Sequence, residues 1–141
     1  MEKEVNRTWL FHRPPEEVWE YLTNPELLEL WLMKSDFQPV PGHKFHFVYL
    51  PKIDSNYNGA VNCEVLEVNP VSKLSYSWET TTRNGSRKLN SIVIWTLAAK
   101  ENGTELHLRH TGFTLSEDVS AHSTGWNTCL KRAEELLNTV K

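Results

Sequence analysis

Three Asn-Gly pairs lie between residues 58 and 103 of the chain: Asn58-Gly59, Asn84-Gly85 and Asn102-Gly103. Asn-Gly accepts the positive φ angles of tight turns, and it is the strongest short-range signal for a β-hairpin. The segments around these pairs alternate apolar and polar side chains, which is typical of strands with one buried face. We therefore expect an antiparallel meander, with strands near residues 44–50, 59–69, 72–80, 88–99 and 104–112.

The rest of the chain predicts one more strand and three helices. Residues 4–12 alternate as a first strand, and Pro14-Pro15-Glu16-Glu17 begins a helix, because Pro and acidic residues suit the first helical turn. Asn24 is the predicted N-cap of a second, short helix. A stripe at helical spacing predicts a long final helix over about 118–140, formed by Trp126, Cys129, Leu130, Ala133, Leu136, Leu137 and Val140.

A long helix with an apolar stripe and a sheet with an apolar face can bury those surfaces against each other. We predict an α+β fold in which an antiparallel β-sheet wraps around the long C-terminal helix, with two short helices after the first strand. The 141 residues suit one domain, so we expect residues 1–141 to form a single domain.

Net charge and hydropathy limit the kinds of partner that the protein can bind. The net charge of −3 gives no basic surface for nucleic acid, and apolar stretches of at most four residues exclude membrane insertion. The N-terminus has no apolar signal core, and Cys63 and Cys129 are far apart in sequence, so we expect reduced thiols and a cytoplasmic location.

Aromatic residues are abundant, with six Trp, five Phe and four Tyr. Strand and helix periodicity places many of them between sheet and helix, with Trp31 near the mouth of that space and Ile92 and Ile94 on the outer face. They either fill a core or line a ligand site, and Gly125 either leaves room there or marks a kink. The predicted ligand-binding residues are Trp31, Phe47, Tyr49, Tyr76, Trp78, Trp95, His110, Phe113, Trp126 and Leu130.

Signals for catalysis and metals are weak. His43 and His46, like His107 and His110, are three apart on predicted strands and point to opposite faces, so we expect no metal site and no cofactor. Glu64 and Glu79 would face inward only if the strand register slipped by one. His110 is either a polar anchor for a ligand or a hydrogen-bonded structural residue, and we assign no catalytic residue.

Motifs along the whole chain resemble the AHSA family, the activator of heat-shock ATPase homologues. The pattern P-x-x-V-W-x-x-x-T-x-P-E-x-x-x-x-W begins at Pro15 and ends at Trp31. Further matches are Leu74-Ser75-Tyr76-Ser77-Trp78, Val93-Ile94-Trp95-Thr96-Leu97, His110-Thr111-Gly112-Phe113 and Gly125-Trp126. The resemblance implies the helix-grip fold of the START-like (SRPBCC, birch-pollen-allergen-like) superfamily, in which binding of hydrophobic ligands is the commonest role.

Three functions follow as hypotheses. The first is a binding protein for a hydrophobic or aromatic small molecule, such as a lipid, polyketide or flavonoid, in an internal cavity and in a stress response. The second is a protein-interaction module, such as a heat-shock chaperone cofactor, with an exposed patch around Ile92 and Ile94 and a closed interior. The third is a cyclase or hydrolase, which needs an inward His with an acid or Tyr partner, for example His110 near Tyr76.

Overall fold

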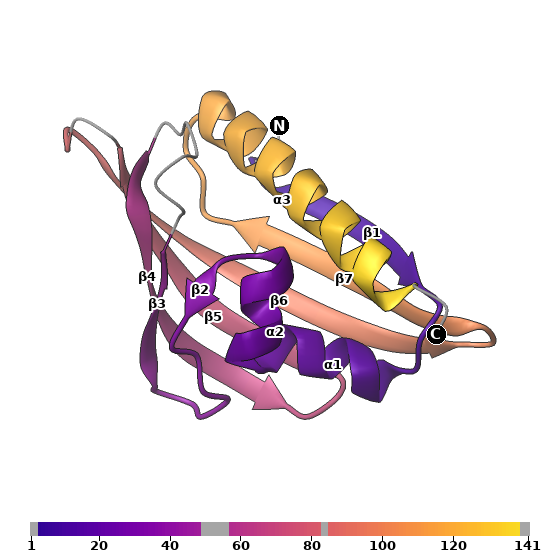
Figure 1. The fold of residues 1–141 in the computed structure, drawn as a ribbon. Helices are drawn as coiled ribbons and strands as arrows, with labels where there is room; N and C mark the ends of the chain where they lie inside the picture. Colours follow the sequence, from indigo (N-terminus) through magenta and orange to yellow (C-terminus); the bar gives the residue numbers. More distant parts are fainter. Residues whose placement is uncertain (1–2, 49–56, 83–84, 139–141) are drawn as a thin grey trace.

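The computed structural model describes residues 3–48, 57–82 and 85–138, with backbone alone at 57–59. Within these residues, seven strands form one antiparallel sheet in the order β1-β7-β6-β5-β4-β3-β2 (Figure 1). Their bounds are β1 Val5–Phe11, β2 Lys34–Ser35, β3 Lys44–Val48, β4 Tyr57–Asn69, β5 Lys73–Thr82, β6 Lys88–Lys100 and β7 Gly103–Thr111. The predicted meander from β3 to β7 is confirmed, and β1 extends it by pairing with β7.

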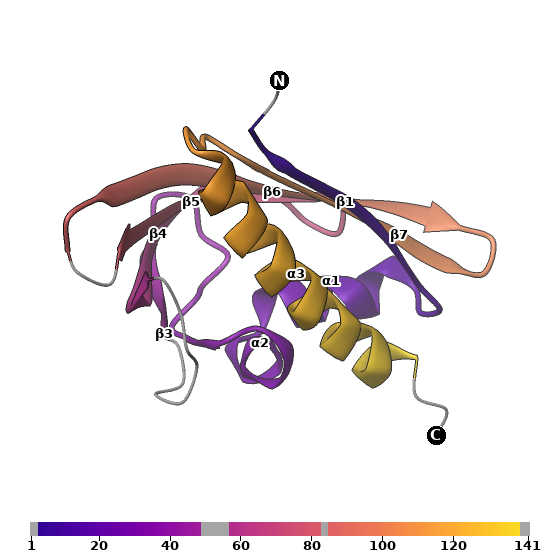
Figure 2. The same cartoon turned by 90° about the horizontal axis from the view of Figure 1, so that it is seen from above.

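Three helices lie on one side of this sheet: α1 Pro15–Thr23, α2 Pro25–Trp31 and α3 Ser116–Leu137. The sheet curls, and α3 lies across its concave face (Figure 2), which confirms the predicted helix-grip arrangement. α2 packs against α3 and β2, whereas α1 contacts β6 and β7. No helix in the described part of the chain is both long and apolar enough to cross a bilayer.

Local sequence sets the two short helices. Pro15 opens α1 and is followed by Glu16 and Glu17, whose carboxylates suit the positive end of the helix dipole. Asn24 is the residue between the helices, and its side chain accepts a hydrogen bond from the backbone N–H of Glu26 at 3.0 Å. This confirms Asn24 as the N-cap of α2.

The structure describes both residues of two of the three Asn-Gly pairs and only the glycine of the third. Lys100 pairs with Gly103, so Glu101 and Asn102 form the turn between β6 and β7. Gly85 has a φ of +75° between β5 and β6, whereas Asn84 lies outside the described residues. The prediction for Asn58-Gly59 is wrong, because this pair lies inside β4, where the register with β5 shifts between Tyr57 and Val61. Glycine inside a strand often marks such an irregularity.

Alternation along β6 separates the two faces of the sheet as the sequence indicated. Val93 and Trp95 are fully buried on the concave face, whereas Ile92 is 40% exposed on the convex face and Ile94 is half-buried. The core therefore lies between the concave face and the three helices. The short edge strand β2 has no counterpart in the sequence prediction, because its two residues are too few to show a period.

Candidate functional site

The structure brings nine of the ten predicted ligand-binding residues into one buried group, and Tyr49 lies outside the described residues. We call this group the aromatic cluster: Trp31, Phe47, Tyr76, Trp78, Trp95, His110, Phe113, Trp126 and Leu130. Strands β3, β5, β6 and β7 and the residues just after β7 supply its sheet side, and α2 and α3 supply the rest. Each member is at most 7% exposed.

The rings of the aromatic cluster contact one another. The ring centroid of Trp126 lies 5.2 Å from that of Trp78 and 5.3 Å from that of Trp95, and the Trp78 centroid lies 5.4 Å from that of Phe47. Trp31 is 1% exposed and donates its indole N–H to the carbonyl of Tyr21 at 2.8 Å. Trp31 therefore lies inside the cluster, and its expected place near a mouth is wrong.

His110 is held by hydrogen bonds on both ring nitrogens. Ser91 Oγ donates to the Trp78 carbonyl at 2.9 Å, so it has no second hydrogen and accepts from His110 Nε2, 2.8 Å away. His110 Nδ1 accepts from the indole N–H of Trp126 at 2.9 Å. The imidazole is therefore neutral with its hydrogen on Nε2, and burial lowers its pKa well below the usual range.

These contacts separate His110 from Tyr76. Tyr76 Oη accepts from the indole N–H of Trp95 at 2.9 Å, so the described residues do not contain the His110–Tyr76 pair that the enzyme hypothesis used as its example. His110 instead ties β7 to β6 through Ser91 and to α3 through Trp126. That is the structural role left open by the sequence.

Two residues of the site were missed at the sequence level. His122 lies on α3 one turn before Trp126, and its ring centroid is 5.1 Å from that of His110 and 4.7 Å from that of Phe113. Its Nδ1 donates to the carbonyl of Asp118 at 2.9 Å, and burial lowers its pKa. Extending the apolar stripe backward by four residues from Trp126 finds His122, and pairing the strands finds Ser91 opposite Trp78.

Two hydrogen donors in the cluster lack a protein acceptor. The indole N–H of Trp78 is buried and finds no partner among the described residues. Tyr76 Oη accepts from Trp95, but its own hydrogen has no acceptor in the described part of the chain. Burial raises the pKa of Tyr76, so this phenol stays protonated.

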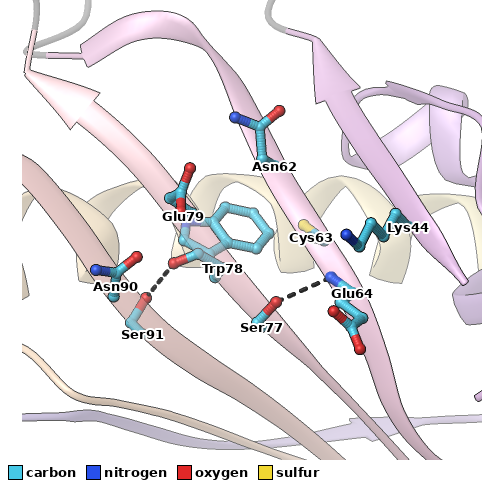
Figure 3. Close-up of a pocket in the computed structure, with 9 residues that line it drawn as sticks. All are labelled: Lys44, Asn62, Cys63, Glu64, Ser77, Trp78, Glu79, Asn90 and Ser91. Atoms are coloured by element: carbon cyan, nitrogen blue, oxygen red, sulfur yellow. Dashed lines mark hydrogen bonds between the residues drawn. The ribbon is translucent and has the colours of Figure 1, made fainter. Parts of the chain in front are cut away.

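A pocket of about 300 Å³ opens on the convex face, beneath the same strands (Figure 3). Its lining residues are Lys44, Asn62, Cys63, Glu64, Ser77, Trp78, Glu79, Asn90 and Ser91. Glu64 and Glu79 thus lie on the outer face, without the register slip that would have turned them inward. The pocket lies where the β4–β5 ladder is interrupted between the pairs Asn62–Glu79 and Val65–Tyr76.

At this interruption a side chain replaces a backbone partner. Ser77 Oγ accepts from the backbone N–H of Glu64 at 2.9 Å (Figure 3). The buried residues Cys63, Trp78 and Ser91 thereby contribute to the lining of an otherwise polar surface pocket. No group of three or more His, Cys, Asp or Glu side chains in the described part of the chain is arranged to hold a metal ion.

Comparisons with known proteins agree with this architecture. The family model described as Activator of Hsp90 ATPase homolog 1-like protein matches residues 12–138. Protein MLL2253 from Mesorhizobium loti is 33% identical, with a TM-score of 0.85 over 98% of both chains. DynU16, from the dynemicin biosynthetic locus, is 20% identical with a TM-score of 0.81, over 99% of this chain and 48% of that one.

A third structure, the Aha1 dimer from Colwellia psychrerythraea, is 18% identical with a TM-score of 0.74 over 96% of each chain. At these identities DynU16 and the Aha1 dimer show a common fold. No curated protein matches the chain in sequence. The family match over residues 12–138 shows that the chain belongs to the Activator of Hsp90 ATPase homolog 1-like family.

Proposed function

We propose that this chain is a cytoplasmic, single-domain protein that binds a hydrophobic or aromatic small molecule within the aromatic cluster. The observation that carries the proposal is the buried Trp78 N–H, which finds no acceptor among the described residues. Buried polar groups in native proteins are nearly always paired, so such a donor needs an explanation. Binding sites for small molecules combine apolar walls with few polar groups, and a ligand oxygen beside Trp78 gives this N–H its partner.

The proposal includes a route for the ligand. The rings contact one another, so a ligand has to displace at least one of them. Phe113 is 7% exposed, the largest exposed fraction in the cluster, and it follows β7 on the connection to α3. We infer that Phe113 swings outward to admit the ligand.

Tryptophan fluorescence tests binding, because three cluster members are indoles of the sheet and α3. The folded protein is titrated with a fatty acid, a flavonoid and an aromatic polyketide, and we expect saturable quenching with at least one of them. For the route, Phe113→Ala should raise the association rate several-fold. The matched control is Leu115→Ala, which changes an exposed side chain on the same connection. Absence of quenching with every ligand on a folded protein would overturn the proposal.

A second candidate is a chaperone cofactor, favoured by Ile92, which is 40% exposed on the convex face. This hypothesis also expects a closed interior, and the rings of the aromatic cluster do contact one another. The test is a pull-down and an ATPase assay with the cognate heat-shock chaperone. We expect Ile92→Lys to abolish binding and rate stimulation, whereas no binding by the unchanged protein would reject this candidate.

A further inference from the structure

Most polar groups of the aromatic cluster have hydrogen-bond partners, and two hydrogen donors do not. The indole N–H groups of Trp31, Trp95 and Trp126 donate to Tyr21, Tyr76 and His110, at 2.8, 2.9 and 2.9 Å. Both nitrogens of His110 are bonded. What remains among the nine described residues of the cluster is the Trp78 N–H and the Tyr76 O–H, and both are hydrogen donors, whereas the buried Nε2 of the neighbouring His122 can act only as an acceptor.

The rings that carry these two donors are neighbours on one strand. Tyr76 and Trp78 are two residues apart on β5, so they share the concave face. Their ring centroids are 6.4 Å apart, and their ring planes differ by 24°. Phe47 of β3 contacts both, with centroid distances of 6.1 Å to Tyr76 and 5.4 Å to Trp78. One planar ligand alongside β5 can therefore contact both rings.

Charge in this region is already neutralised. His110 is neutral through its hydrogen bonds. The carboxylate of Asp118, on α3 near His122, receives two bonds from the Arg87 guanidinium, at 2.7 and 3.2 Å. An ionised ligand group placed beside Tyr76 and Trp78 would be desolvated without a counter-charge, which is costly.

We propose that the ligand is an uncharged aromatic carbonyl compound whose oxygen accepts hydrogen bonds from the Trp78 N–H and the Tyr76 O–H. This proposal rests on the proposed function. It assigns Trp78 and Tyr76 as the residues that determine specificity, and it requires an acceptor oxygen on the ligand. A pure hydrocarbon leaves both donors buried without partners, and a carboxylate adds a charge that nothing in the cluster balances.

The test compares three probes of one shape: 9-fluorenone, fluorene and fluorene-9-carboxylate. Affinities are measured by fluorescence on the full chain, and the Trp78 indole signal is followed in ¹⁵N-labelled protein. We expect 9-fluorenone to bind about tenfold more tightly than fluorene, the factor that about 1.4 kcal/mol of hydrogen bonding gives, and more tightly than the carboxylate. The Trp78 indole hydrogen should shift downfield with 9-fluorenone and not with fluorene.

Variants provide a second readout. Trp78→Phe keeps an aromatic ring and removes the N–H, and Tyr76→Phe removes only the hydroxyl. Each should lower the preference for 9-fluorenone over fluorene several-fold, whereas Trp19→Phe, a half-buried residue outside the cluster, should not.

The outcomes separate the two proposals. Equal binding of 9-fluorenone and fluorene, or tightest binding of the carboxylate, overturns the carbonyl proposal and leaves the binding function standing. Failure of all three probes, and of the ligands above, overturns both. The indole shift is measured on the unchanged protein, so it decides the question even where a variant does not fold.

Discussion

At the scale of single residues, Gly125 lies on the exposed side of α3, and a methyl group added to it would meet nothing within 4 Å. The sequence left open whether this glycine makes room for a ligand. The structure shows that it faces away from the cluster, in a helix interior where glycine is less favourable than alanine by about 1 kcal/mol. We predict that Gly125→Ala raises the free energy of unfolding by about 1 kcal/mol in urea denaturation.

A matched glycine gives the opposite result. Gly103 has a φ of +154°, and a Cβ there would overlap the backbone carbonyl of Phe11 on the neighbouring strand β1. Gly103→Ala should therefore destabilise the protein by more than about 2 kcal/mol, because backbone rather than a flexible side chain has to move. Similar unfolding midpoints for the two variants would contradict this account of both glycines.

Val71 has a backbone conformation that suits its side chain poorly. It lies in the loop between β4 and β5 with a φ of +70°, which is strained for a β-branched residue. We predict that Val71→Gly raises the free energy of unfolding by about 1 kcal/mol. Val68→Gly, in β4 and packed on the core, is the control and should lower it. A loss of stability in Val71→Gly would show that packing of the Val71 side chain stabilises the fold by more than the strained φ angle destabilises it.

At the scale of elements, Arg87 joins the β5–β6 hairpin to α3. Its guanidinium binds the Asp118 carboxylate with two hydrogen bonds, and the Asp118 side chain is only 4% exposed. Arg87→Gln removes the positive charge that faces this buried carboxylate. We therefore predict that the free energy of unfolding, measured in urea, falls by about 2–3 kcal/mol. This figure is smaller than for a fully buried pair, because the Arg87 side chain is partly exposed to solvent. Lys73→Gln, which removes an exposed pair with Glu67, should cost less than about 0.5 kcal/mol. Equal losses would reject the role of this link.

Most elements could be predicted because their signals are local. Alternation along β6 assigned Val93 and Trp95 to the core, and Asn24 carries its own capping chemistry. The Asn58-Gly59 turn was wrong because the same two residues also suit an irregularity within a strand, and only the pairing with β5 distinguishes the two. The interrupted ladder beside Ser77 likewise depends on a neighbouring strand, so a single sequence does not reveal it.

At the scale of the whole molecule, the sequence predicted which rings meet but not how their polar atoms pair. Periodicity placed Trp78, Trp126 and His110 on facing surfaces. The bonds from Ser91 and Trp126 to His110, and the missing acceptor for Trp78, depend on distances between β5, β6, β7 and α3. The curl of the whole sheet sets those distances, and a single sequence does not reveal them. The hydrogen-bond partners in the cluster therefore cannot be predicted from the sequence.

The two buried histidines should make the stability of the whole molecule depend on pH. Burial lowers the pKa of His110, with the neighbouring His122 as a second cause, and burial lowers the pKa of His122 despite its contact with Asp118. An unfolded histidine takes up a proton near pH 6.5, whereas burial in the folded chain favours the neutral form of both. The unfolded state therefore binds more protons below pH 6.5, and stability falls as the pH falls.

We predict that the free energy of unfolding drops by about 1–2.5 kcal/mol between pH 7 and pH 5.5, since each depressed histidine contributes up to about 1.4 kcal/mol per pH unit. Urea unfolding at half-unit steps of pH measures this slope. Glu4, whose pKa is lowered mainly by its bond to Arg109, loses its contribution only below about pH 4.5 and does not enter this window. His122→Asn should reduce the slope by about half, because one of the two titrating groups is gone. A slope unchanged in that variant would show that His122 is charged in the folded protein, and the neutral interior on which the carbonyl proposal depends would have to be abandoned.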